Sequence, residues 1–318
     1  HNYMHSAYYD NNNPERKYWE GYDAFAQTKE AVHYMEEHAN EEKPFVLFLS
    51  WGPPHSPYEV VPEEFLNLYK DKEITLRPNV PDQMKEKATR DLKGYYAHIT
   101  ALDRCVGMLQ DALKRFGLEE DTIFILTSDH GDMLGSEGLE CKQKPYEENI
   151  IVPFLLKYPA LFGRRGREMD TILSSTDIMP TLLGLSNIHV PKVEGKDLSP
   201  ILRGEIADFT EMALIECITP FGEWERDKGG KEYRGVRTKR YTYVRDLNGP
   251  WLLFDNQKDP YQMRNLVGMT DYKPLQERLD HSLSCLLKEI SDPFLAGDYY
   301  IKQWGYTVNS KGTVEYTP

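Results

Sequence analysis

Residues 121–138 read DTIFILTSDHGDMLGSEG, an apolar run that ends in acidic, histidine and glycine positions. The unbroken apolar character of residues 121–128 predicts a strand that is buried on both faces. Asp129 and His130 follow this strand directly. In open α/β sheets, ligands bind just beyond the carboxyl ends of the strands, where loops carry polar groups over a rigid scaffold. The stretch therefore predicts both a layered α/β fold and a candidate site.

Strands and helices alternate on both sides of this stretch. Buried strands are predicted over residues 44–51 (PFVLFLSW) and 150–159 (IIVPFLLKYP). Helical spacing of apolar residues predicts helices over residues 23–42, 82–116 and 175–186. This alternation predicts a mostly parallel, layered α/β sheet with helices on both faces.

The sequence changes character near residue 205. Shorter apolar runs separated by polar turns follow, and then one further helical pattern. They occupy residues 211–218, 233–246, 251–255 and 273–290. We therefore expect a smaller antiparallel sheet with a helix packed on it, and we divide the chain into an α/β domain (residues 1–208) and a C-terminal subdomain (residues 209–318).

Composition narrows the possible partners and says little about location. The 318 residues are 40% hydrophobic and 28% charged, which is ordinary for a globular protein. A formal net charge of −13 argues against a nucleic-acid partner. The four cysteines have neither zinc-site nor disulfide-framework spacing, and no apolar run is long enough for a transmembrane helix. The sequence begins without Met, which suggests a fragment or processed chain, so the missing signal peptide leaves a periplasmic or secreted location open.

Polar residues at two strand ends could share one site. His55 follows the strand predicted over residues 44–51, and Asp129 with His130 follows the strand predicted over residues 121–128. If these strands are neighbours, the three side chains gather at one edge of the sheet. Carboxylate and imidazole groups on a rigid edge suit a divalent cation. The alternative is that Asp129 caps the following turn and His130 is an ordinary hydrogen-bonded residue.

The segment after this loop adds further charged candidates. Lys142 and Lys144 lie within reach of the same edge, where a lysine near a metal can hold an anionic oxygen. A solvated loop lysine is the commoner role. For Glu147 and Glu148 both an exposed face and an arginine partner stay open, and for His55 the alternative is a residue that stabilises a proline-rich turn.

Six blocks of the chain occur in a fixed order, namely residues 44–58, 95–107, 127–159, 175–185, 193–202 and 234–266. In this order they resemble the type I sulfatases of the alkaline-phosphatase-like superfamily. The resemblance extends from residue 44 to residue 266 and so over most of the chain, and an ordered set of this kind is far more specific than a single motif. The resemblance implies an alkaline-phosphatase-like layered fold and hydrolysis of a small-molecule or carbohydrate sulfate ester.

The resemblance also assigns roles to particular residues. Asp129 and His130 match the second pair of metal ligands, which implies a divalent cation, calcium first and manganese as the alternative. His55 matches the histidine that contacts the sulfate group or the leaving oxygen, and Lys142 matches the lysine that binds a sulfate oxygen. The chain departs from many relatives at Glu137, where they have His before Gly-Leu.

The reactive centre of the family is missing from this sequence. Sulfatases carry a C/S-x-P/A-x-R motif whose Cys or Ser becomes formylglycine, the nucleophile. No cysteine segment here fits that motif, and in SPILR (residues 199–203) the proline comes one place early. We therefore expect a sulfuric ester hydrolase whose present chain is inactive alone and associates with a missing N-terminal part or another chain. The alternatives are a phosphonate or phosphate ester hydrolase of the same superfamily, and a non-catalytic binding module on this scaffold.

Overall fold

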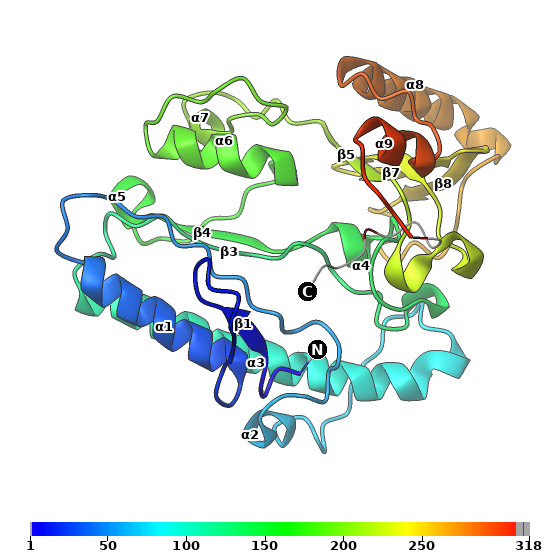
Figure 1. Cartoon of the computed structure of the whole chain (residues 1–318). Coiled ribbons are helices and arrows are strands. Elements are labelled where there is room, and N and C mark those ends of the chain that lie inside the picture. The colour runs from blue at the N-terminus through cyan, green and yellow to red at the C-terminus, as the bar shows by residue number, and fades with distance from the viewer. Residues whose placement is uncertain (1, 310–313, 315–318) are drawn as a thin grey trace. The chain divides into compact units, whose positions relative to one another are not determined.

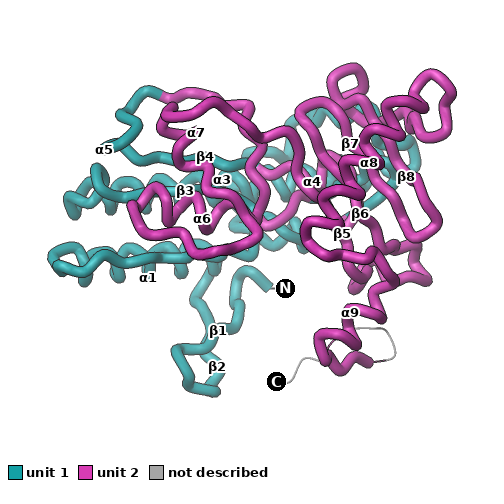
Figure 2. Tube along the Cα trace, turned by 90° about the horizontal axis from the view of Figure 1, so that it is seen from above, with its two compact units in different colours: residues 1–128, 132–140, 153–165 teal, residues 129–131, 141–152, 166–318 magenta. Residues whose placement is uncertain are grey.

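The protein is described from a computed structural model, which covers residues 2–309 and 314. Two compact units are present, and each consists of separate stretches of the chain (Figure 2). Unit 1 comprises residues 1–128, 132–140 and 153–165, and unit 2 comprises residues 129–131, 141–152 and 166–318.

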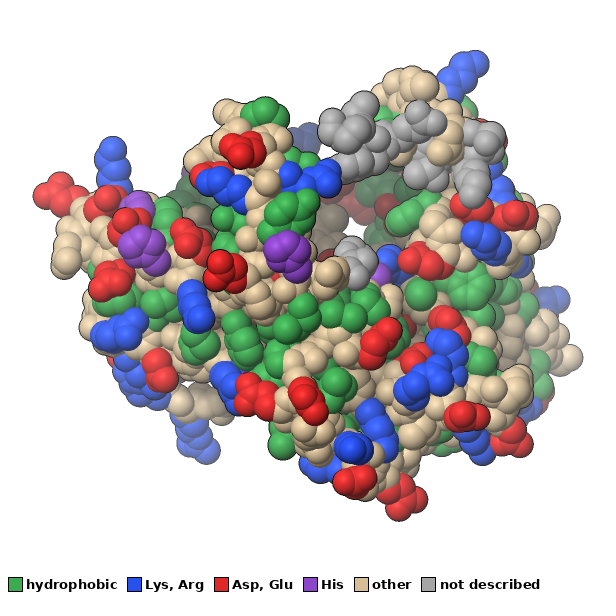
Figure 3. Space-filling view, turned by 60° about the horizontal axis from the view of Figure 1, so that its bottom comes forward, with side chains coloured by type: hydrophobic (Ala, Val, Ile, Leu, Met, Phe, Trp, Pro, Cys, Tyr) green, Lys and Arg blue, Asp and Glu red, His purple; other side chains and the backbone are tan. Residues whose placement is uncertain are grey.

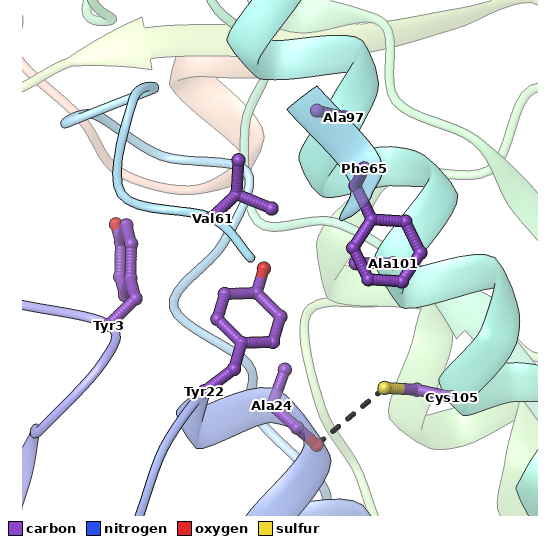
Figure 4. Packing of buried hydrophobic residues seen from close by; sticks show 8 residues of the cluster. All are labelled: Tyr3, Tyr22, Ala24, Val61, Phe65, Ala97, Ala101 and Cys105. Carbon is purple, nitrogen blue, oxygen red and sulfur yellow. Dashed lines mark hydrogen bonds between the residues drawn. The ribbon is translucent and has the colours of Figure 1, made fainter. Parts of the chain in front are cut away.

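Two long helices form the base of unit 1. They are α1 (Asp23–His38) and α3 (Lys85–Arg115), both within the predicted ranges, and they run alongside each other in Figure 1. Their buried positions recur every three or four residues, which places one apolar stripe of each helix against the other. Small side chains of α3 allow close contact, and the Cys105 thiol lies 3.6 Å from the carbonyl oxygen of Ala24 in α1 (Figure 4).

The strands of unit 1 pair in the direction opposite to the prediction. β3 (Phe124–Thr127) and β4 (Phe154–Lys157) are antiparallel, with Thr127 opposite Phe154. The predicted parallel arrangement was therefore wrong for this pair. A parallel connection needs a long crossover, usually helical, whereas the described residues between β3 and β4 form only a 3₁₀ turn (Ser136–Gly138) and the short helix α4 (Glu147–Ile150).

The prediction of a strand over residues 44–51 was also wrong. Within the described part of the chain this segment has no regular secondary structure and pairs with no strand. Phe45 and Leu49 pack on one side, against a cluster that includes residues of α1 and α3. Val46 and Phe48 point outward and are 96% and 91% exposed. The apolar run alone could not show that a second strand would be needed to cover it.

Short elements complete unit 1. A small antiparallel hairpin precedes α1, and single helical turns lie between the larger elements. They are β1 (Ala7–Tyr9), β2 (Arg16–Tyr18), α2 (Glu63–Leu66), η1 (Asp82–Met84) and α5 (Pro159–Phe162). None of them was predicted as a separate element, because each is too short to show a periodic pattern, and η1 falls within the helix predicted over residues 82–116.

Unit 2 contains the predicted antiparallel sheet. Its four strands pair in chain order, each antiparallel to the next. They are β5 (Met212–Cys217), β6 (Tyr233–Thr238), β7 (Tyr241–Asp246) and β8 (Gly249–Asp255). The run predicted over residues 233–246 is a hairpin, because the chain turns between Thr238 and Tyr241.

Both faces of this sheet are covered within unit 2. Leu279 and Leu283 of helix α8 (Lys273–Glu289) pack on Val236, Tyr243 and Leu253. The other face has a second cluster that includes Val244, Phe254 and the ring of Tyr146. The expected helix on the small sheet is therefore confirmed.

The remaining elements of unit 2 are mostly short. Helix α6 (Ser175–Leu185) is within its predicted range, and the N–H of Ser174 donates to the carboxylate of Asp177 at 2.9 Å. The others are α7 (Ser199–Arg203), η3 (Gly222–Trp224), η4 (Arg226–Lys228), η5 (Thr270–Tyr272) and α9 (Gly297–Gln303). Over the described residues, no helix combines the length and apolar character needed to cross a membrane. On the face shown in Figure 3, acidic and basic side chains are interspersed.

Candidate metal and anion site

Asp129 and His130 lie side by side in unit 2. The Asp129 side chain is 85% exposed, and its Oδ2 lies 3.6 Å from Nε2 of His130. Asp129 Oδ1 accepts the backbone N–H of His130 at 3.0 Å. This contact reaches the next residue, whereas the turn cap of the alternative prediction would reach the N–H two residues on, and Asp129 Oδ2 is the oxygen that lies beside the imidazole.

The ring of His130 has a defined tautomer. Its Nδ1 lies 2.7 Å from the carbonyl oxygen of Gly131. Because a carbonyl only accepts, Nδ1 carries the proton, and in the neutral ring the lone pair is on Nε2. Histidines that bind metals usually donate their other N–H to a carbonyl or a carboxylate in this way. The pair Asp129 and His130 therefore has the donor atoms and the tautomer that a divalent cation requires.

Gly131 fixes the backbone behind this pair. A Cβ atom at this position would lie 1.8 Å from the carbonyl oxygen of Glu148, so only glycine allows the two backbones to approach so closely. The N–H of Gly131 donates to the carbonyl of Asn149 at 2.9 Å. The Asn149 side chain in turn donates to the carbonyl of Lys144 at 3.1 Å. These bonds connect the strand end to the segment that carries Lys142.

Lys142 is presented by a tightly bent segment, residues 139–146, called the Lys142 loop below. Both neighbours of this lysine have a positive φ, 59° at Cys141 and 71° at Gln143. Such values are uncommon for residues other than glycine, and they persist only where surrounding contacts hold them. Lys142 therefore projects from a backbone whose shape is imposed by its surroundings.

Glu147 has the arginine partner that was one of its two predicted roles. Arg237 of β6 donates to both carboxylate oxygens, at 2.8 Å and 2.7 Å. The N–H of Glu147 donates to the side chain of Gln262 at 2.9 Å. This bidentate pair fixes α4 to the small sheet, so Glu147 stabilises the site segment from behind.

His55 belongs to unit 1, where residues 52–58 form what is called the His55 loop below. Its imidazole Nδ1 lies 2.9 Å from the carbonyl oxygen of Ser56, which places the proton on Nδ1 in this ring also. The hydroxyl of Tyr3 donates to the carbonyls of His55 and Ser56 at 2.8 Å and 3.1 Å. Tyr58 donates to Asp132 at 2.7 Å.

A buried histidine of α3 supports the same loop. Nε2 of His98 lies 3.4 Å from the carbonyl of Pro57, and the hydroxyl of Tyr22 donates to its Nδ1 at 2.7 Å. Burial lowers the pKa of His98 to about 4, so this ring is neutral near pH 7. One helical turn away, a Cβ at Gly94 would lie 2.3 Å from the carbonyl of Tyr58, so the loop packs directly on the helix backbone.

The candidate residues are divided between the two units, and the contacts given above join only Asp129 and His130. Asp129, His130 and Lys142 belong to unit 2, and His55 belongs to unit 1. Over residues 2–309 and 314, no group of three or more His, Cys, Asp and Glu side chains is gathered around a common metal position. Sequence reasoning missed Tyr3 as a supporting residue, because no spacing pattern connects it with a loop 52 residues away.

Comparisons with known proteins identify the family of the chain. The sulfatase family profile matches residues 1–188. A second profile, described as the C-terminal part of N-sulphoglucosamine sulphohydrolase, matches residues 135–289. The chain therefore belongs to the sulfatase family, and the predicted membership is confirmed.

Individual relatives extend over nearly the whole chain. An ulvan-active sulfatase of Formosa agariphila is 39% identical over 96% of this chain and 60% of its own length. An endo-4-O-sulfatase of Bacteroides thetaiotaomicron is 34% identical over 84% of this chain and 56% of its own length. The chain thus spans about three-fifths of these relatives.

Solved structures confirm the fold. The Bacteroides fragilis protein designated yidJ superposes with a TM-score of 0.82 at 27% identity, covering 93% of this chain and 65% of its own. A phosphonate monoester hydrolase of Agrobacterium radiobacter superposes with a TM-score of 0.70 at 24% identity, over 92% of this chain and 64% of its own. The alkaline-phosphatase-like α/β class predicted from the sequence is therefore confirmed.

Proposed function

We propose that this chain is part of a sulfuric ester hydrolase that acts on a sulfated saccharide. The observation that carries the proposal is the Asp129–His130 pair, with a carboxylate oxygen 3.6 Å from an imidazole nitrogen in a sulfatase-family chain. The substrate class rests on the 39% identical ulvan-active sulfatase and the 34% identical endo-4-O-sulfatase.

In this proposal Asp129 and His130 hold a divalent cation. Calcium is the first candidate because it prefers oxygen ligands, and manganese is the alternative because it accepts imidazole. Two side chains are fewer than the six to eight ligands that calcium takes, so further ligands must come from elsewhere. A bound cation would polarise the sulfate oxygens.

The anion contacts are assigned to Lys142 and His55. The Lys142 ammonium would hold a sulfate oxygen by its positive charge. The Nδ1–H of His55 donates to the carbonyl oxygen of Ser56 at 2.9 Å, so Nε2 is the ring nitrogen that would contact the substrate. In the imidazolium form this nitrogen would donate to the leaving oxygen and stabilise the charge that develops there.

We further propose that the chain alone is inactive. The printed sequence holds no C/S-x-P/A-x-R motif, so it supplies no formylglycine nucleophile. We also propose that the chain divides into two domains, namely an α/β domain over residues 1–208 and a C-terminal subdomain over residues 209–318.

The outward side of residues 45–51 supports an association with another polypeptide segment. Val46 and Phe48 are 96% and 91% exposed, and Leu155 of β4 is 61% exposed. Unpaired backbone with apolar side chains favours the addition of a strand. The expected covering segment is the N-terminal part of the gene product, and a second copy of this chain is the alternative.

The test is an activity assay of the full-length gene product on sulfated oligosaccharides, with calcium, manganese or chelator. We expect cation-dependent release of sulfate and a loss of about 100-fold or more in Asp129→Ala, since ligand loss removes the cation that stabilises the transition state. Asp121→Asn, a change at an exposed carboxylate, is the matched control. Equal activity of Asp129→Ala and the control would reject the metal assignment, and robust turnover by residues 1–318 alone would reject the proposed inactivity.

A phosphonate or phosphate ester hydrolase is the second candidate. It is favoured by the Asp-His metal pair, a variant that also occurs in phosphonate monoester hydrolases. Side-by-side rates on 4-nitrophenyl sulfate and a phenylphosphonate ester separate the two activities. A non-catalytic module is the third candidate, and it gains support if the gene encodes no C/S-x-P/A-x-R motif upstream of His1.

A further inference from the structure

The Lys142 loop is held by a loop of the small sheet. Residues 218–232, which connect β5 to β6, form what is called the β5–β6 loop below. The Gln143 side chain donates to the carbonyl of Phe221 at 2.8 Å and accepts the N–H of the same residue at 3.1 Å. Two hydrogen bonds of this kind fix both the distance and the orientation between the Gln143 side chain and the backbone of Phe221, because the N–H and the carbonyl of Phe221 are both bonded.

Lys144 makes a second contact with the same loop. Its ammonium donates to the carbonyl of Gly229 at 2.9 Å and lies 3.8 Å from the centre of the Trp224 ring. The residue is only 7% exposed, and no carboxylate in the described residues forms an ion pair with it. Burial lowers the pKa of Lys144. The carbonyl of Gly229 and the ring of Trp224 therefore take the place that a carboxylate partner has for most buried ammonium groups.

The backbone on both sides of Lys142 is strained. Gln143 itself has φ of 71°, and Cys141 on the other side of Lys142 has φ of 59°. Backbone strain of this kind is common at functional sites. Gln143 and Lys144 are the two residues after Lys142, so their contacts restrict the position of its backbone.

We propose that Gln143 and Lys144 are positioning residues, which fix Lys142 by anchoring its loop to the β5–β6 loop. The proposal rests on the proposed function in one respect, namely that Lys142 binds the sulfate group. It adds that the small sheet takes part in sulfate binding, through backbone contacts at Phe221 and Gly229.

The test uses the full-length gene product and two variants of Gln143. Gln143→Ala loses the paired hydrogen bonds and keeps the unfavourable φ, whereas Gln143→Gly loses the same bonds and relieves the strain. Gln257→Ala, at an exposed turn residue, is the control. The readouts are the inhibition constant of inorganic sulfate, KM and kcat for a sulfated oligosaccharide, and hydrogen exchange of residues 139–146 and 218–232.

We expect both Gln143 variants to weaken sulfate binding and raise KM by about tenfold, with a smaller change in kcat, because an interaction worth about 1.4 kcal/mol is a factor of ten. Exchange should rise in both loops, and Gln143→Gly should unfold at or above the wild-type temperature. Lys144→Met should likewise weaken sulfate binding without loss of stability.

Two outcomes would overturn the proposal. One is unchanged sulfate inhibition in Gln143→Gly and Lys144→Met. The other is faster exchange of residues 139–146 with no change in residues 218–232. Failure of the proposed function has a different signature, namely a wild-type protein that turns over no sulfate ester, and in that case direct titration with inorganic sulfate replaces the inhibition constant and, with hydrogen exchange, decides the positioning claim.

Discussion

The His55 loop and the Lys142 loop present one polar side chain each, but they are held by different means. Neutral donors from the core of unit 1, Tyr3 and His98, hold the first loop through its backbone carbonyls. A reciprocal amide contact and a buried ammonium hold the second, whose backbone has two positive φ values at non-glycine residues. The position of the His55 loop thus depends on the packed core of unit 1, whereas the position of the Lys142 loop depends on its contacts with the β5–β6 loop.

The two loops should therefore differ in how strongly a mutation of their supporting residues changes the stability of the fold. Residues that hold the His55 loop also fill the core, so their replacement should unfold unit 1 as well as misplace His55. Residues that hold the Lys142 loop bear strain and an unpaired charge, so their replacement should spare stability. Four predictions, from the largest expected effect to the smallest, test this comparison.

The largest effect is expected for His98→Ala. This ring is fully buried, contacts Tyr22 and Tyr3, and hydrogen-bonds through both nitrogens. Its removal should lower the free energy of unfolding by about 3 kcal/mol, because a cavity forms and the Tyr22 hydroxyl loses its acceptor. Urea unfolding measures the loss. A loss below about 1 kcal/mol would show that the loop is not coupled to the core in this way.

Lowering the pH should reduce the free energy of unfolding through protonation of His98, the residue that supports the His55 loop. The pKa of His98 is about 4 in the folded chain against an ordinary 6.5, so between these values the unfolded chain binds the extra proton and the folded chain does not. Stability should therefore fall as the pH drops from about 6.5 to about 4, by roughly 3 kcal/mol from this group. The difference in unfolding free energy between pH 7 and pH 4.5 should shrink in His98→Gln; an unchanged difference would contradict the assignment.

A smaller effect is expected for Tyr3→Phe. The change removes one hydroxyl that donates to the carbonyls of His55 and Ser56, and it keeps the ring in the core. We expect a loss of about 1–2 kcal/mol in unfolding free energy. Hydrogen exchange should be faster over residues 52–58. Tyr8→Phe, at a partly exposed tyrosine of β1, is the control and should change neither quantity.

The smallest effect on stability is expected for Gln143→Gly. Relief of the positive φ offsets the loss of two hydrogen bonds to Phe221, so the unfolding free energy should change by less than about 1 kcal/mol. Thermal unfolding of residues 1–318 measures this change without any need for activity. A loss as large as that of Tyr3→Phe would remove the distinction between the two loops.

The sequence predicted long periodic elements better than pairing. Helices α3 and α8 were predicted because their apolar positions repeat over several turns. The prediction of a strand over residues 44–51 was wrong, because an apolar run indicates that its side chains are buried but not which segment of the protein covers them. The direction in which β3 and β4 pair was also predicted wrongly. Whether two strands run parallel or antiparallel depends on the segment that connects them and not on either strand alone.

The candidate site divides in the same way. Adjacent Asp129 and His130 could be predicted as a pair, because their position after a strand and a family resemblance both point to them. Their tautomer and support could not, because these depend on the carbonyl of Gly131 and on the close approach of Glu148. Contacts between residues far apart in the sequence, such as Gln143 with Phe221, leave no local pattern.

The proposed association of residues 45–51 with another segment implies that the chain would suit fragment complementation. Its inward side is already packed, while Val46 and Phe48 present an ordered apolar row to the outside. A synthetic peptide with apolar residues at alternate positions could therefore add as a strand with little further ordering of the receiver. A fluorophore on such a peptide would turn docking into an optical signal, and the same chain could serve as one half of a split reporter.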